Sequence, residues 1–199
     1  MKQKTTFSLA LDGYKKLLVV GFLTIILLLF SYPFSNIAIV PTIIQICSFI
    51  MLIGIIYEPI WTQGTHDANY FERGLEKKDK LKGLKAGLIM IVPSVVTLVL
   101  LIICKLFTEF DAMVIFAHIN APFRWAFTWI APMGFQIYGM NTPVNFTWTQ
   151  LTSLWQIALC GLYFLIIPIV CHVSYTLGLK RIDLSEKLIY KNDKKKNGK

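Results

Sequence analysis

The stretch VVGFLTIILLLFSY, residues 19–32, decides the fold, because it is apolar and has no charged side chain. It lies in a run from about residue 17 to 34. A helix needs roughly 20 predominantly apolar residues to cross a bilayer. Similar runs follow at about 39–57, 84–107 and 151–179. The sequence therefore predicts an all-α fold, a polytopic membrane helical bundle with four transmembrane helices.

Composition supports the same class. Of the 199 residues, 55% are hydrophobic and 16% are charged, whereas soluble domains average roughly 45–50% and 25%. We expect a single transmembrane domain over residues 1–180 and a basic cytoplasmic tail over residues 181–199.

The basic residues indicate the orientation. All but Lys105 and Arg124 lie in three stretches: before the first apolar run, between the second and third, and after the fourth. Cytoplasmic segments near helix ends carry such an excess of Lys and Arg. We therefore expect a bacterial cytoplasmic (cell) membrane location with both termini in the cytoplasm. The net charge of +9 then favours anionic lipid headgroups as a partner of the tail rather than nucleic acid.

Residues 110–149 are the hardest part to place. The run MVIFAHI, residues 113–119, is too short to span, and FRWAFTWIAPMGFQIYGM, residues 123–140, is interrupted by Pro132. A spanning helix here would put the Lys-rich tail outside, against the charge rule. We expect one or two short interfacial or re-entrant helices on the outer face.

The most distinctive polar stretch is YEPIWTQGTHDANYFERGLEKKDKLKGLKAGL, residues 57–88. We expect a cytoplasmic loop in which Gly64 permits a turn and Asp67 or Asn69 caps a short helix. An ordered loop and a docking or ligand site explain it equally well. The candidate residues for a partner or ligand are Trp61, Gly64, His66, Asp67, Asn69, Glu72, Arg73, Asp79 and Lys82.

Ionisable residues inside membrane helices usually mark function, and these runs have no Asp or Glu in a core position. Gln45, Gln156 and His172 form a candidate intramembrane polar site. The chain has none of the spacings that place metal ligands or a nucleophile on one face. We therefore predict no catalytic residues, no metal and no cofactor.

Two short motifs carry a resemblance. W-x-x-G-x-x-D-x-N occurs at Trp61, Gly64, Asp67 and Asn69, and D-x-x-K-G begins at Asp79. In these motifs the chain resembles a family of uncharacterised small multi-pass membrane proteins of Gram-positive bacteria. The resemblance implies a bacterial membrane location and brings no catalytic residues.

Three functions fit these observations. The leading hypothesis is a non-enzymatic accessory, scaffold or assembly subunit with a cytoplasmic docking loop, bound to a membrane-protein partner or to further copies of itself. The first alternative is a transport component that works as an oligomer or with a partner. The second alternative is a membrane-embedded enzyme that uses His66, Asp67 and His172.

Overall fold

The computed structural model describes residues 4–34, 37, 39–75, 79–107, 110, 112–123, 127 and 152–182. The elements in this part of the chain are α1 (Thr6–Ser31), η1 (Tyr32–Phe34), α2 (Ile39–Glu72), α3 (Lys82–Met90), α4 (Val92–Phe107), α5 (Ala112–Ile119), η2 (Ala121–Phe123), α8 (Leu154–Leu162), η4 (Tyr163–Leu165) and α9 (Ile166–Leu179). They are all helical, which confirms the predicted all-α bundle.

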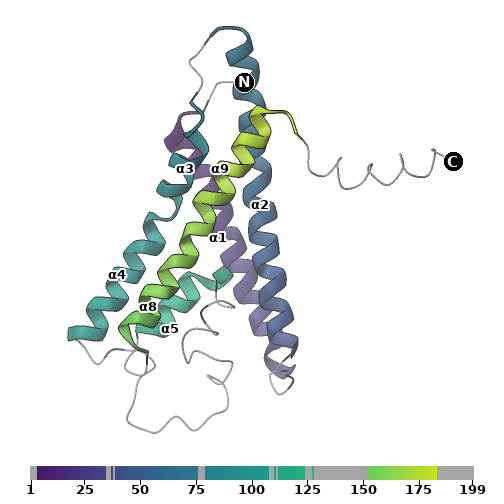
Figure 1. Ribbon diagram of the computed structural model, residues 1–199. Coiled ribbons are helices and arrows are strands. Elements are labelled where there is room, and N and C mark those ends of the chain that lie inside the picture. The colour runs from purple at the N-terminus through teal and green to yellow at the C-terminus, as the bar shows by residue number, and fades with distance from the viewer. Residues whose placement is uncertain are drawn as a thin grey trace, which may run out of the picture.

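Four helical segments are long and apolar enough to cross a membrane: Thr6–Phe30, Thr42–Glu72, Lys82–Phe107 and Leu154–Leu179. The third combines α3 and α4, which are separated by a turn at Ile91, and the fourth combines α8, η4 and α9. The chain is thus a multi-pass membrane protein. The beginning of α1 and the end of α9 lie at the same end of the bundle (Figure 1), which we call the terminal end.

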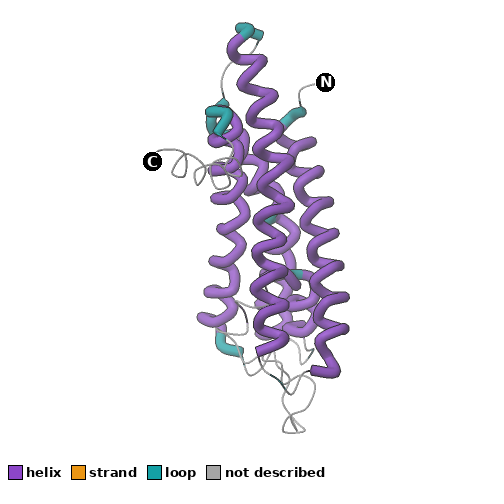
Figure 2. The backbone as a smooth tube through the Cα atoms, turned by 90° about the vertical axis from the view of Figure 1, so that its right-hand side faces the viewer, coloured by secondary structure: helices purple, strands orange, loops and turns teal. Residues whose placement is uncertain are grey.

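At the terminal end, α9 packs against both α2 and α3, and α1 packs against the same two helices. The long helices run side by side (Figure 2). On α2, Leu52, Ile56 and Ile60 recur every four residues and are buried, as expected for one face of a packed helix. Farther along the chain, α4 packs against α5 and α8 instead of α1.

The short helix α5 spans eight residues, and the chain after it turns back into the bundle. Asn120 donates a hydrogen bond to Thr97 Oγ1 in α4 at 3.1 Å. The Phe123 and Phe127 rings lie 5.6 and 6.2 Å from the Phe164 ring. Among the described residues of 110–149, α5 and η2 are therefore short helices that pack against the bundle. Residues 124–126 and 128–151, and 183–199 of the tail, lie outside the described residues.

The predicted loop over residues 57–88 is wrong for most of its length. Helix α2 continues to Glu72, and α3 begins at Lys82. The reason is that Ile60, Gly64 and Asp67 recur on one helical face and are buried, so this polar stretch still has a side that packs against other helices. With 34 residues, α2 is roughly 50 Å long and exceeds the roughly 30 Å of hydrocarbon.

Candidate functional site

Helices α2 and α9 approach most closely at two glycines. A Cβ atom on Gly64 would lie 2.5 Å from the Tyr175 carbonyl oxygen, and one on Gly178 would collide with the Trp61 carbonyl oxygen. Small residues at such positions let helix backbones meet, as is common between membrane helices. Gly83 has the same role between α3 and α9, because its Cβ would lie 2.6 Å from the Cys171 carbonyl oxygen. The three helices are thereby held together around one point.

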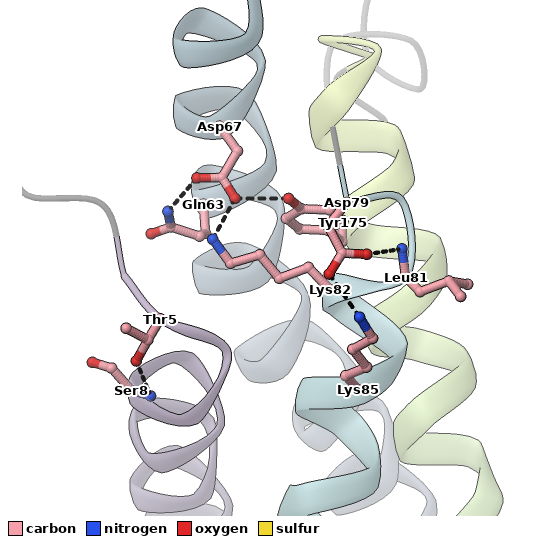
Figure 3. A network of polar contacts seen from close by, with 9 residues as sticks. All are labelled: Thr5, Ser8, Gln63, Asp67, Asp79, Leu81, Lys82, Lys85 and Tyr175. Atoms are coloured by element: carbon pink, nitrogen blue, oxygen red, sulfur yellow. Dashed lines mark hydrogen bonds and ion pairs between the residues drawn. The ribbon is translucent and has the colours of Figure 1, made fainter. Parts of the chain in front are cut away.

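Asp67 lies at this point and is fully buried. Its Oδ1 accepts a hydrogen bond from Gln63 Nε2 at 2.8 Å. Its Oδ2 accepts bonds from Lys82 Nζ and from Tyr175 Oη, both at 2.7 Å. Figure 3 shows these side chains converging from α2, α3 and α9. We call Gln63, Asp67, Lys82 and Tyr175 the buried network.

The charges in the buried network balance. The side chain of Lys82 is 8% exposed and that of Asp67 is 0% exposed. Two opposite charges removed from water need each other and further hydrogen bonds to offset the loss of hydration. Gln63 and Tyr175 provide these bonds to the carboxylate. Both Asp67 oxygens are thus occupied by the chain itself, and solvent does not reach them in this conformation.

A second cluster lies near the C-terminal end of α2, which is at the terminal end of the bundle. One Arg181 amino group donates to Asn69 Oδ1 at 2.5 Å and to Glu72 Oε2 at 2.7 Å. Trp61 Nε1 donates to the Ile182 carbonyl oxygen at 2.8 Å. We call Trp61, Asn69, Glu72 and Arg181 the tip cluster. It ties the segment that leaves α9 to the side of α2.

The backbone at Arg181 explains how that segment leaves the helix. The Ile182 N–H donates to the Leu177 carbonyl at 3.0 Å, and the Arg181 N–H donates to the Gly178 carbonyl at 2.9 Å. These two bonds form a Schellman motif, in which the residue at the position of Arg181 is left-handed and is usually glycine. Arg181 has a φ of 52°. The chain therefore holds a side chain in a conformation that costs an L-residue roughly 1–2 kcal/mol.

Most of the predicted partner residues lie in one of these two clusters or in the glycine contacts. Asp67 and Lys82 belong to the buried network, Trp61, Asn69 and Glu72 to the tip cluster, and Gly64 to the contact between α2 and α9. His66 is half-buried and Arg73 is exposed; they belong to neither cluster. The predicted turn at Gly64 and the predicted helix cap at Asp67 or Asn69 are both wrong, because these residues lie inside α2.

Asp79 precedes α3 and is outside the membrane spans. Its Oδ1 accepts a hydrogen bond from the Leu81 N–H at 3.0 Å, and its Oδ2 pairs with Lys85 Nζ at 2.8 Å. The bond from Lys85, followed by that from the Leu81 N–H, lowers the pKa of the Asp79 carboxyl. Asp79 thus holds the first turn of α3.

The sequence did not single out Gln63, Tyr175 or Arg181 as site residues. Tyr175 and Arg181 lie more than a hundred positions along the chain from their partners on α2. The spacing of Gln63 and Asp67, four residues apart on one helical face, is the one local signal that could have indicated a bonded pair.

The candidate intramembrane site of Gln45, Gln156 and His172 does not form one cluster. Gln156 Oε1 accepts bonds from the Ser153 N–H and hydroxyl, both at 2.8 Å, and so caps α8. Gly178 meets Gly64, and α2 and α9 run in the same direction (Figure 1). His172 therefore lies about 13 residues, or roughly 20 Å, farther along the bundle axis than Gln45.

Gln45 and His172 share a different property. Gln45 Nε2 and His172 Nδ1 are buried and meet no hydrogen-bond partner in the part of the chain that the structure describes. In the same described ranges, no group of three or more His, Cys, Asp or Glu side chains is arranged to hold a metal ion. The carboxylate of Asp67 bonds to Gln63, Lys82 and Tyr175.

The fold and the two clusters define a multi-pass helical membrane protein in which a buried ion pair joins α2 to α3 at the terminal end. No family model, no curated protein and no solved structure matches the chain.

Proposed function

We propose that the protein is a non-enzymatic accessory or assembly subunit of the bacterial cell membrane. Its partner is another membrane protein, and the surface offered to that partner is the tip of α2. In this proposal the terminal end faces the cytoplasm, because the described parts of the basic stretches, residues 4–16, 79–85 and 180–181, lie there. The resemblance of the 61–83 motifs to small Gram-positive membrane proteins supports the same location.

The observation that carries this proposal is that both carboxylate oxygens of Asp67 are bonded within the protein. An acid that handles protons or substrate has to reach them, whereas every oxygen of this carboxylate is bonded inside the protein and is buried. The most distinctive polar residues therefore fix three helices relative to one another. A fixed helical end that projects beyond the hydrocarbon is suited to contact another protein.

The tip of α2 provides the polar surface for that contact. Asn69, Glu72 and Arg73 are exposed, and Arg181 is exposed next to them. Charged and amide groups on a rigid helix provide specificity through complementary hydrogen bonds and charges. Residues held in this way need little reordering on binding.

The test is purification of the tagged, full-length protein in mild detergent from its own membrane, followed by mass spectrometry. We expect a stoichiometric membrane protein to copurify with the wild type. The charge reversal Arg73→Glu removes an exposed cation that lies outside both clusters and should release that partner. Lys16→Glu is the matched control on exposed α1 surface. A wild-type protein that purifies alone as a monomer would overturn the proposal.

The unpaired atoms of Gln45 and His172 favour a second candidate, a transport component. A buried amide nitrogen without a hydrogen-bond partner is costly in lipid. In a transport component, that nitrogen would donate its hydrogen bond to a polar solute. Gln45→Leu should then change uptake of some solute by intact cells, while Gln156→Leu should act only through the cap of α8. Wild-type uptake by the Gln45 variant across a broad panel of solutes would exclude this candidate.

A further inference from the structure

The surface that α1 and α2 turn away from the bundle carries two opposite charges. Glu58 follows buried Ile56 by two residues, and Lys15 precedes buried Leu17 by two. Each side chain therefore points to the side of its helix opposite the core, and both are exposed. Neither belongs to an ion pair with another described residue, or to either cluster above.

These two charges lie at nearly the same depth in the bundle. Gly21 of α1 and Phe49 of α2 both lie against η2: a Cβ on Gly21 would be 4.0 Å from an η2 atom, and the Phe49 ring is 6.3 Å from an η2 ring. Helices α1 and α2 are antiparallel (Figure 1). Glu58 is nine residues beyond Phe49, which is the level of residue 12 in α1. Lys15 is three residues from that level, or roughly 4.5 Å.

That depth is the edge of the apolar part of both helices. Residues 17–31 of α1 and 39–57 of α2 contain no charged side chain, and Lys15 and Glu58 lie just beyond these stretches. Beside the hydrocarbon, water surrounds a charge only in part, so opposite charges attract each other more strongly there than in bulk water. A carboxylate at this depth therefore gains more from a cation than one at the tip of α2.

Gly54 lies one turn before Glu58 on the same exposed side of α2. A Cβ on any other glycine of the four described spans would have a neighbour within about 4 Å, whereas one on Gly54 would have none. Glycine inside a helix costs about 1 kcal/mol relative to alanine. Between membrane helices, the close approach of a second backbone offsets that cost. Because no described part of the chain approaches Gly54, it points to a helix from another molecule.

A second copy of the chain supplies both the helix and the charges. Two copies in one membrane have the same orientation, so a two-fold axis between them runs along the membrane normal and brings residues of equal depth together. We propose that the protein forms a homodimer in which α2 of each copy packs on α1 of the other. Glu58 of each copy pairs with Lys15 of the second copy, and Gly54 lets the helices approach. This dimer does not depend on the partner proposed for the tip of α2.

The experiment uses two full-length copies that carry different affinity tags. They are expressed together, extracted in mild detergent and purified through one tag, and recovery of the other tag measures association. We expect recovery with the wild type. Glu58→Lys in both copies, or Lys15→Glu in both copies, should weaken association roughly tenfold or more, because like charges then face each other twice.

The two charge reversals should rescue each other when they are in different copies. With Glu58→Lys in one copy and Lys15→Glu in the other, both contacts between the copies again join opposite charges. Recovery of the second tag should therefore return to the wild-type level. A contact between Lys15 and Glu58 inside one chain would not be restored, so this combination distinguishes the dimer from an internal ion pair.

Matched variants separate this surface from general effects of charge and size. Lys80→Glu makes the same charge change at an exposed lysine before α3 and should leave recovery unchanged. Gly54→Leu should weaken association severalfold, while the fold of one copy tolerates it because nothing lies within 4 Å. Val99→Phe adds bulk to an exposed site on α4, across the bundle from α2 (Figure 1), and should have no effect. Circular dichroism confirms that each variant is folded.

Three outcomes would overturn the proposal. These are a wild type that recovers none of the second tag, full recovery in both charge-reversed variants, and a mixed combination that recovers no more than either variant alone. If recovery instead fell only in Arg73→Glu, the copies would meet at the tip of α2 and not through α1 and the middle of α2.

Discussion

Lys82 Nζ lies 2.7 Å from Asp67 Oδ2, and the two residues come from different helices that have no other charged pair between them in the described part of the chain. Their burial makes each charge dependent on the other. Exposed pairs in this protein, such as Asp79 with Lys85, have water as an alternative partner. The buried pair has none, and its removal is therefore the sharpest test of the site.

Breaking the buried pair should destabilise the protein strongly. Asp67→Asn and Lys82→Met should each lower the free energy of unfolding by about 3–5 kcal/mol, because each leaves one charge buried without a partner. The double variant should lose much less than the sum, since no lone charge remains. Unfolding in mixed micelles, followed by circular dichroism, measures all three. Additive losses would show that the two charges act independently.

The close contact of α2 with α9 makes a separate steric prediction. Gly64→Ala and Gly178→Ala each add a Cβ where backbone atoms already lie, and should cost about 1–3 kcal/mol through forced shifts of the helices. Gly54 on the same helix has nothing within 4 Å of its Cβ position. Gly54→Ala should therefore be neutral or stabilise slightly, because alanine favours a helix. Thermal melts of the three variants decide the order.

The fold was largely predictable from the sequence, and the site was predictable only in part. Runs of apolar residues determine membrane helices because every backbone polar group must be satisfied within the segment. The stretch 57–72 was misassigned because its polarity suggested a loop, while the face formed by Ile60, Gly64 and Asp67 needed α9 as a partner to be recognised. That partner lies more than a hundred residues away in the chain, and single-sequence patterns do not reveal such pairs.

Two variants of Arg181 should show whether the hydrogen bonds of its side chain offset the cost of its left-handed backbone. Arg181→Ala keeps the left-handed φ of 52° and loses the bonds to Asn69 and Glu72. Arg181→Gly loses the same bonds but relieves the strain, worth about 1 kcal/mol. Hydrogen exchange of the Arg181 and Ile182 amides should thus be fastest in the alanine variant. Equal exchange in both variants would mean that the backbone conformation costs nothing there.

The start of α3 should loosen in acid. The bonds from Lys85 and Leu81 lower the pKa of Asp79 from its ordinary value of 3.8. A carboxyl with a lowered pKa in the folded state contributes stability above that ordinary value, and the contribution disappears as the pH falls through the lowered pKa. Because the pair is exposed, the effect should be under about 1 kcal/mol and local.

Exchange of the Leu81 and Lys82 amides, corrected for intrinsic rates, should accelerate below about pH 4. In Asp79→Asn these amides should be faster at neutral pH and lose that acid step; an unchanged step in this variant would assign the sensitivity to another carboxyl group.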